Sequence, residues 1–201
     1  MERLMSSTRY IWDRIFGPRV RADQLHDLRL RLSAEANRCE ASPIEVEMAV
    51  RLRVLREESV ALTGKPEACQ RCARPRNERW PGGHCCSAET RHLFTDSEVA
   101  ALRLAGTRPN HLRPPASEQA GCAFRGPRGC SLEAAHRPNL CVRYTCRELQ
   151  TEIDQRRDGP AIVQLNEQLR ILFEHFVTKR DERIESAHLA ELEASLRHRN
   201  R

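Results

Sequence analysis

Residues 121–146 read GCAFRGPRGCSLEAAHRPNLCVRYTC. This short stretch holds four cysteines, four arginines and two prolines, and its apolar residues keep neither a helical nor a strand period for long. Burial in a hydrophobic core therefore does not explain the positions of Cys122, Cys130, Cys141 and Cys146. We expect that a ligand bound by these side chains decides how this part of the chain folds.

Nine cysteines in 201 residues raise the question whether they form disulfides or bind a metal. Residues 1–20 carry charges every few positions and lack the continuous apolar run of a secretory signal, and no segment approaches the length of a membrane span. We therefore expect a cytoplasmic protein with no membrane partner. In a reducing cytoplasm, clustered cysteines are more often metal ligands or redox groups than structural disulfides.

The segments before the cysteines have the pattern of helices. Residues 21–40 carry a leucine stripe at helical spacing. Residues 43–63 follow Ser42, a predicted N-cap whose capping-box partner is Glu45. A shorter helix is expected to begin at Thr95, between Cys86 and Cys122 in the sequence.

The helical period returns after the last cysteine. Residues 160–177 carry the clearest apolar stripe of the chain, and a charged helix is expected at 182–197. We expect the stripe to pack within the fold, with a helical dimer interface as the alternative. For the helix at Thr95, Glu98 is the predicted capping partner.

We therefore predict a mostly α-helical protein, in which a helical scaffold surrounds an irregular cysteine-rich metal-binding module. The N-terminal helical region comprises residues 1–66, the module 67–149 and the C-terminal helical region 150–201. Trp80 is the only large apolar side chain within residues 67–92. Burial in this segment cannot offset an ordering entropy of roughly 1–2 kcal/mol per residue, so the segment is either disordered or held by a ligand.

Eight of the nine cysteines are candidate metal ligands. Cys39 is set aside because it continues the leucine stripe of the first helix and is expected to be a core thiol. A Cys-x-x-Cys pair lets two sulfurs meet one metal, and four thiolates complete a zinc site or hold an iron–sulfur cluster. The predicted ligands are Cys69, Cys72, Cys85, Cys86, Cys122, Cys130, Cys141 and Cys146.

The adjacent cysteines Cys85 and Cys86 favour one compact centre over two separate fingers, because neighbouring side chains in extended backbone face opposite sides. His84 and His136 are alternative ligands that could replace a cysteine. A simpler alternative is that the Cys-x-x-Cys pair forms a redox dithiol and the other cysteines are buried thiols. Zinc and iron–sulfur both stay open, since a set of thiolates suits either.

The order of these motifs resembles the YkgJ-type cysteine-cluster family. The resemblance covers roughly residues 67–149, with a Cys-x-x-Cys pair, a double cysteine, the capped helix at Thr95 and then GCSLEAAHRPNLCVRYTC at 129–146. The spacing between the first two motifs is longer than is usual in the family. The resemblance implies chelation of zinc or iron. A flagellin lysine methylase is similar in its cysteine motifs, which implies a cluster-dependent enzyme as an alternative.

Twelve arginines and six acidic residues lie between Cys69 and Cys146. Thiolates bound to divalent ions would reduce this positive surplus, so we expect the arginines to neutralise a metal centre. We therefore do not expect nucleic acid as a partner. Three function classes stay open: a metal-binding protein, an enzyme of the lysine methylase or thiol redox kind, and an interaction module folded by zinc. The expected partners are a metal ion or cluster, and a protein or second copy bound through the C-terminal helices.

Overall fold

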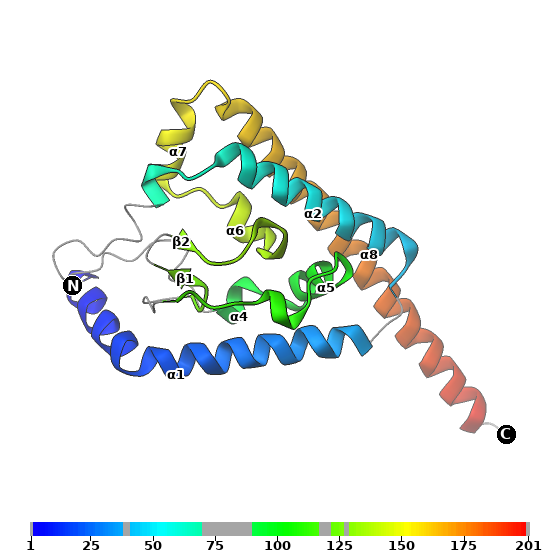
Figure 1. The fold of residues 1–201 in the computed structure, drawn as a ribbon. Coiled ribbons are helices and arrows are strands. Elements are labelled where there is room, and N and C mark those ends of the chain that lie inside the picture. The colour runs from blue at the N-terminus through cyan, green and yellow to red at the C-terminus, as the bar shows by residue number, and fades with distance from the viewer. Residues whose placement is uncertain (1, 38–40, 70–89, 117–121, 127–128, 200–201) are drawn as a thin grey trace.

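The computed structural model describes residues 2–37, 41–69, 90–116, 122–126 and 129–199, and this part of the chain is mostly helical. Three long helices, α1 (Glu2–Asn37), α2 (Pro43–Thr63) and α8 (Gly159–Arg199), form its frame (Figure 1). Most of the shorter elements lie between α1 on one side and the pair of α2 and α8 on the other, and α7 (Arg147–Asp154) lies at the end of the frame where α8 begins. In chain order the elements are α1 (Glu2–Asn37), α2 (Pro43–Thr63), α4 (Thr90–Leu93), α5 (Asp96–Leu104), a 3-10 turn (Pro109–His111), β1 (Arg125–Gly126), β2 (Gly129–Cys130), a 3-10 turn (Ala134–His136), α6 (Asn139–Arg143), α7 (Arg147–Asp154) and α8 (Gly159–Arg199).

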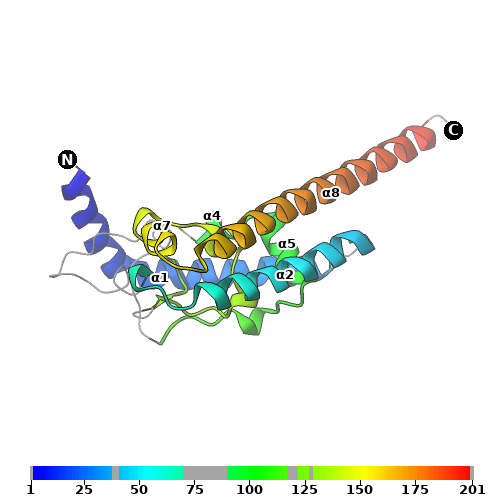
Figure 2. The ribbon, with the colours of Figure 1, turned by 90° about the horizontal axis from the view of Figure 1, so that it is seen from above.

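Helix α2 begins as the sequence predicts. The Ser42 hydroxyl accepts the backbone N–H of Glu45 at 3.2 Å, and the Glu45 carboxylate accepts the Ser42 N–H at 2.7 Å, so both halves of the capping box form. The helix runs beside α8 in both views (Figures 1 and 2). Leu52 of α2 and Phe176 of α8 are fully buried in the core between them.

Helix α1 is longer than predicted, because it begins at Glu2 and not near residue 21. Gly17 and Pro18 would normally end a helix, since proline lacks a backbone N–H and collides with the preceding turn. Here α1 continues through them and bends in its N-terminal part (Figure 1). The predicted leucine stripe is confirmed: its leucines face a core that also holds Phe94 and Phe124.

Helix α8 corrects the prediction of two C-terminal helices. It runs without interruption from Gly159 to Arg199, since no glycine or proline separates residues 177 and 182. The prediction that its apolar stripe packs within the fold is confirmed: Ile162, Leu169 and Phe176 are fully buried. This stripe is therefore not a free dimer face.

The middle of the chain shares its cores with both flanking regions. One core joins α1 to α4, α5 and the segment around Cys122, and a second joins α2, α5 and α8. A third core holds Ala68, α7 and the start of α8. The described helices include none that is long and apolar enough to cross a bilayer.

Candidate functional site

Five of the eight predicted ligands fall within the described residues, where they lie in two groups. Cys72, Cys85 and Cys86 lie outside the described residues, as do His84 and the excluded Cys39. Two cysteines of the first group, Cys122 and Cys141, belong to the core against α1, and Cys130 is exposed near Cys122. The second group packs against the core at the start of α8. The first group comprises Cys122, Cys130 and Cys141, and the second Cys69 and Cys146.

The first group is built around the short β1–β2 ribbon. Cys122 is buried just before β1, and its sulfur lies 3.9 Å from the hydroxyl of Thr90, which donates to it. Cys130 ends β2, where it pairs with Arg125 across the ribbon. Gly129, the first residue of β2, has a φ of +104°, a conformation that other residues rarely adopt. This conformation allows β2 to pair antiparallel with β1. Cys141 on α6 packs against the same core as Cys122.

Burial shapes the chemistry of Cys122. Desolvation raises the pKa of its thiol to about 11, and the neighbouring Cys130 acts in the same direction. Without a cation beside it, Cys122 therefore keeps its proton at neutral pH. A metal bound here would have to displace that proton, which couples metal affinity to pH.

The second group lies where α7 meets α8. Cys69 and Cys146 both pack against the core of Ala68, Leu149, Ile153 and Ile162. The Glu152 carboxylate of α7 accepts the backbone N–H groups of Glu67 and Ala68 at 3.0 and 2.8 Å. This double hydrogen bond fixes the chain one residue before Cys69 to the helix that begins directly after Cys146.

The segment from Cys69 to Thr90 connects the two cysteine groups along the sequence. The residues between Cys69 and Thr90 include Cys72, Cys85 and Cys86, which lie outside the described part of the chain. At one end of this segment, Cys69 shares a core with Cys146. At the other end, the Thr90 hydroxyl contacts Cys122, accepts the backbone N–H of Ala123 at 3.2 Å and so ties α4 to the chain before β1. The Thr90 N–H donates to Gln24 of α1 at 2.9 Å.

A buried polar network holds α6, the helix that carries Cys141. The Glu98 carboxylate accepts the side-chain and backbone N–H groups of Asn139 at 2.9 and 3.1 Å, and the N–H of Leu140 at 3.4 Å. Arg56 of α2 donates to the Asn139 side-chain oxygen at 3.2 Å and to the carbonyl oxygen of Ala135 at 3.1 Å. Arg56 and Asn139 are fully buried and Glu98 nearly so, which makes this network the polar centre of the fold.

The network corrects the predicted role of Glu98. Its backbone N–H donates to the N-cap hydroxyl of Thr95 at 3.3 Å, as expected, but its carboxylate turns away to α6. The reason is energetic, since α6 begins inside the protein and its first N–H groups need a buried acceptor. Sequence analysis missed Arg56, Glu98 and Asn139 as positioning residues. One signal in the sequence could have indicated this network. Arg56 is a charged residue four positions after Leu52, on the apolar side of the helix, where a charge needs a buried partner.

Both charges of the network are perturbed by burial. Desolvation raises the pKa of Glu98 to about 7, although its hydrogen bonds from Asn139 and the charge of Arg56 act against this shift. Desolvation also lowers the pKa of Arg56 to about 10. Among the described residues, none accepts a hydrogen bond from Nε of Arg56. Each charge therefore depends on the other to stay buried.

The pH dependence of stability is expected to reveal Glu98. Because its folded pKa of about 7 exceeds the ordinary value of 4.5, the folded protein binds more protons than the unfolded chain between these pH values. The stability that Glu98 contributes is thus complete below about pH 4.5 and falls as the pH rises to about 7. Urea denaturation at both ends of this window should show a larger loss in the wild type than in Glu98→Gln. Equal losses would mean that Glu98 does not titrate there.

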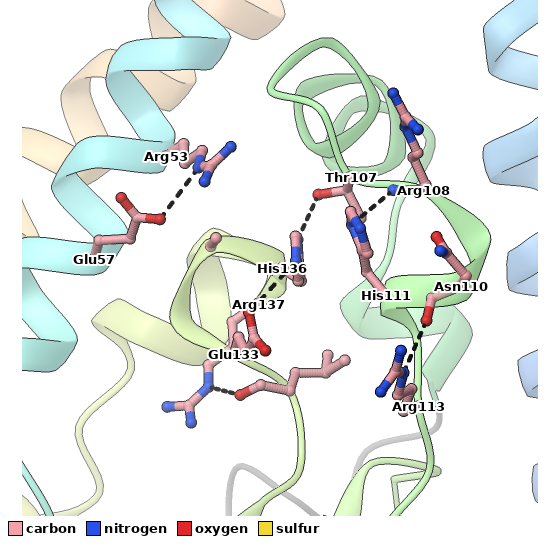
Figure 3. Close-up of polar contacts among 12 residues, drawn as sticks. Arg53, Glu57, Thr107, Arg108, Asn110, His111, Arg113, Glu133, His136 and Arg137 are labelled. Carbon is pink, nitrogen blue, oxygen red and sulfur yellow. Dashed lines mark hydrogen bonds and ion pairs between the residues drawn. The ribbon is translucent and has the colours of Figure 1, made fainter.

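His136, an alternative ligand, is engaged within the protein (Figure 3). Its Nδ1 lies 3.0 Å from the Thr107 hydroxyl, its Nε2 lies 3.9 Å from the Glu133 carboxylate, and its ring stacks on His111 with centroids 4.4 Å apart. Burial, followed by the charge of His111, lowers the pKa of His136. These contacts fix the turn before α6, and the sequence alone did not indicate His111 as a neighbour.

A cavity of about 340 Å³ lies between α8 and the chain around α7. The cavity is lined by Arg143 and Thr145, which precede Cys146 in the sequence, and by Gln150. Its acidic residue, Glu167, is held in an ion pair with Arg170 at 2.6 Å. Thr145 donates to Gln150 at 2.9 Å and Gln150 donates to Asp154 at 2.7 Å, so these two lining residues, like Glu167, already have partners within the protein.

Among the described residues, no three His, Cys, Asp or Glu side chains are arranged to hold a metal ion. Comparisons with protein-family models, curated proteins and solved structures found no match.

Proposed function

We propose that the protein binds a zinc or iron–sulfur centre through its cysteine module. The observation that carries this proposal is the placement of the two cysteine groups at the two ends of one segment. Cys69 and Cys146 pack against the same core, and Thr90 contacts Cys122. Cys72, Cys85 and Cys86 lie between Cys69 and Thr90 in the sequence. A metal bound by the segment's cysteines would tie these two ends together.

The donor chemistry fits such a centre. Thiolates are the ligands that zinc and iron–sulfur clusters prefer, and the set of eight cysteines is large enough for two tetrathiolate sites or one compact cluster. The likeness of residues 67–149 to the YkgJ-type family supports the same class of ligand. A reducing, cytoplasmic setting would keep the cysteines available as ligands.

The scaffold supports the proposal by holding the ligands that it carries. Glu98 and Arg56 fix α6, and Glu152 fixes the chain at Cys69. Metal sites depend on residues that orient the ligands as well as on the ligands themselves. We therefore assign Glu98, Arg56 and Glu152 as positioning residues of the centre.

Anaerobic purification followed by metal and sulfide analysis tests the proposal. Zinc in a colourless protein would identify a zinc site, and equal iron and sulfide with visible absorption would identify a cluster. Cys85→Ser and Cys86→Ser are expected to lose metal, because each replacement removes a thiolate. Cys39→Ser is the matched control and should keep the metal content of the wild type. A metal-free protein in which Cys69 and Cys72 form a reversible disulfide would replace the proposal with a redox function.

A further inference from the structure

The C-terminal part of α8 leaves the body of the protein as a single helix (Figures 1 and 2). Its last anchoring contacts are ion pairs of Arg180 with Glu35 and of Arg183 with Glu45, both at 2.7 Å. Every residue from 184 to 199 is exposed. At 1.5 Å per residue, the projecting part extends for roughly 24 Å.

This projecting part carries an apolar stripe with nothing against it among the described residues. Leu189, Leu192 and Leu196 are each about half exposed and follow one another at spacings of three and four residues. That spacing places the leucines on one side of the helix, as in the seam of a coiled coil. A single helix gains little from such a stripe in water, whereas a second helix would bury it.

The projecting helix is mainly acidic near the body and basic at its end. The acidic residues are Asp181, Glu182, Glu185, Glu191 and Glu193, and the basic residues at the end are Arg197, His198 and Arg199. Arg183 and His188 interrupt the acidic part, and Arg183 is paired with Glu45 of the body. Glu182 and Glu185 continue the leucine stripe toward the N-terminus at heptad positions, and Arg199 continues it toward the C-terminus.

We propose that this stripe binds the same stripe of a second copy, with the two helices antiparallel. In this arrangement Arg199 of each copy lies opposite Glu182 of the other, Leu189 lies opposite Leu192, and Leu196 lies opposite Glu185. Glu182 pairs with Lys179 of its own helix at 2.8 Å, and both side chains are about half exposed, so this pair is open to a second cation. A parallel pair would instead place Glu182 against Glu182 and Arg199 against Arg199, and like charges at such positions disfavour pairing. The antiparallel arrangement also places the two bodies at opposite ends of the helix pair, so that they do not collide.

The proposal relocates the dimer interface that the sequence suggested. The apolar stripe from Ile162 to Phe176 is covered by α7 at Ile162 and by α2 and α5 at Leu169 and Phe176, so it cannot bind a second copy without unfolding the core. The projecting stripe is separate from the cysteine groups. Its test is therefore independent of whether the protein binds a metal.

Sedimentation equilibrium of the full chain tests the interface. The wild type is expected to dimerise, and Leu189→Lys combined with Leu192→Lys should raise the dissociation constant on the order of 100-fold or more, because the facing leucines are replaced by charges. The control carries Val163→Lys and Ile171→Lys, two exposed positions on the same helix within the body. It should dimerise like the wild type, and circular dichroism should show equal helix content in all three proteins.

Charge reversal tests the orientation. Glu182→Arg or Arg199→Glu alone should weaken the dimer by roughly 5- to 30-fold, since each places like charges at both ends of the pair. The two changes together should restore the affinity only in an antiparallel dimer. A wild type that stays monomeric at its highest soluble concentration, a dimer insensitive to the leucine changes, or a double reversal without recovery would each overturn the proposal.

Discussion

Removal of the metal is expected to abolish the amide-exchange protection of residues 69–86 while α2 and α8 keep theirs. This segment has Trp80 as its one large apolar side chain, so burial offsets little of its ordering entropy. Structural zinc contributes roughly 10–16 kcal/mol of apparent binding energy in small peptides, far more than the few apolar side chains here can replace. Hydrogen exchange followed by mass spectrometry, on metal-loaded and chelated protein, measures the difference.

The two helices serve as internal controls for that experiment. Leu52 and Phe176 bury the α2–α8 interface without any cysteine, so its protection should not depend on metal. Unchanged protection of residues 69–86 after complete chelation would contradict the account, since something other than a metal would then hold the segment.

Replacing Arg56 is expected to be the most damaging single change outside the cysteines. Arg56→Met should lower the free energy of unfolding by about 3–5 kcal/mol when measured above pH 7. It removes the hydrogen bonds to Asn139 and Ala135, and Glu98, whose pKa is already about 7, must then take up a proton or stay buried as a carboxylate without its countercharge. The matched control is Arg53→Ala, which removes a half-exposed arginine paired with Glu57 on the same helix and should change stability by about 1 kcal/mol or less. Urea denaturation at constant metal concentration measures both.

A double variant separates lost pairing from lost packing. Adding Glu98→Gln to Arg56→Met removes the second charge, so part of the lost stability should return. If the double variant is less stable than Arg56→Met by the full effect of Glu98→Gln alone, the two residues are not coupled. If Arg56→Met is no worse than Arg53→Ala, the buried network does not hold the fold as described.

Local signals in the sequence predicted the helices that have them. Ser42 and Glu45 correctly predicted the start of α2, and Thr95 that of α5. Such predictions are possible because helix capping involves residues only three positions apart. Helix α8 was divided wrongly at residues 177–182, since a change from an apolar stripe to a charged face resembles an end although no residue there stops a helix. What changes at that point is the surroundings, from the core to solvent.

The positioning network could not be predicted from one sequence. Arg56 and Asn139 are 83 positions apart, and Glu98 had a sufficient local explanation as a capping residue. Their pairing depends on how α2, α5 and α6 pack together, which is a tertiary property. The cysteines, in contrast, were prominent because their number and spacing have no other ready explanation. Their joint binding of a metal stays a prediction.

X-ray absorption at the edge of the bound metal tests the central claim most directly. The account predicts a first shell dominated by sulfur, at about 2.3 Å for zinc, because the ligands are cysteine thiolates. A shell of nitrogen and oxygen at about 2.0–2.2 Å, or an anaerobically purified protein without stoichiometric metal, would contradict it.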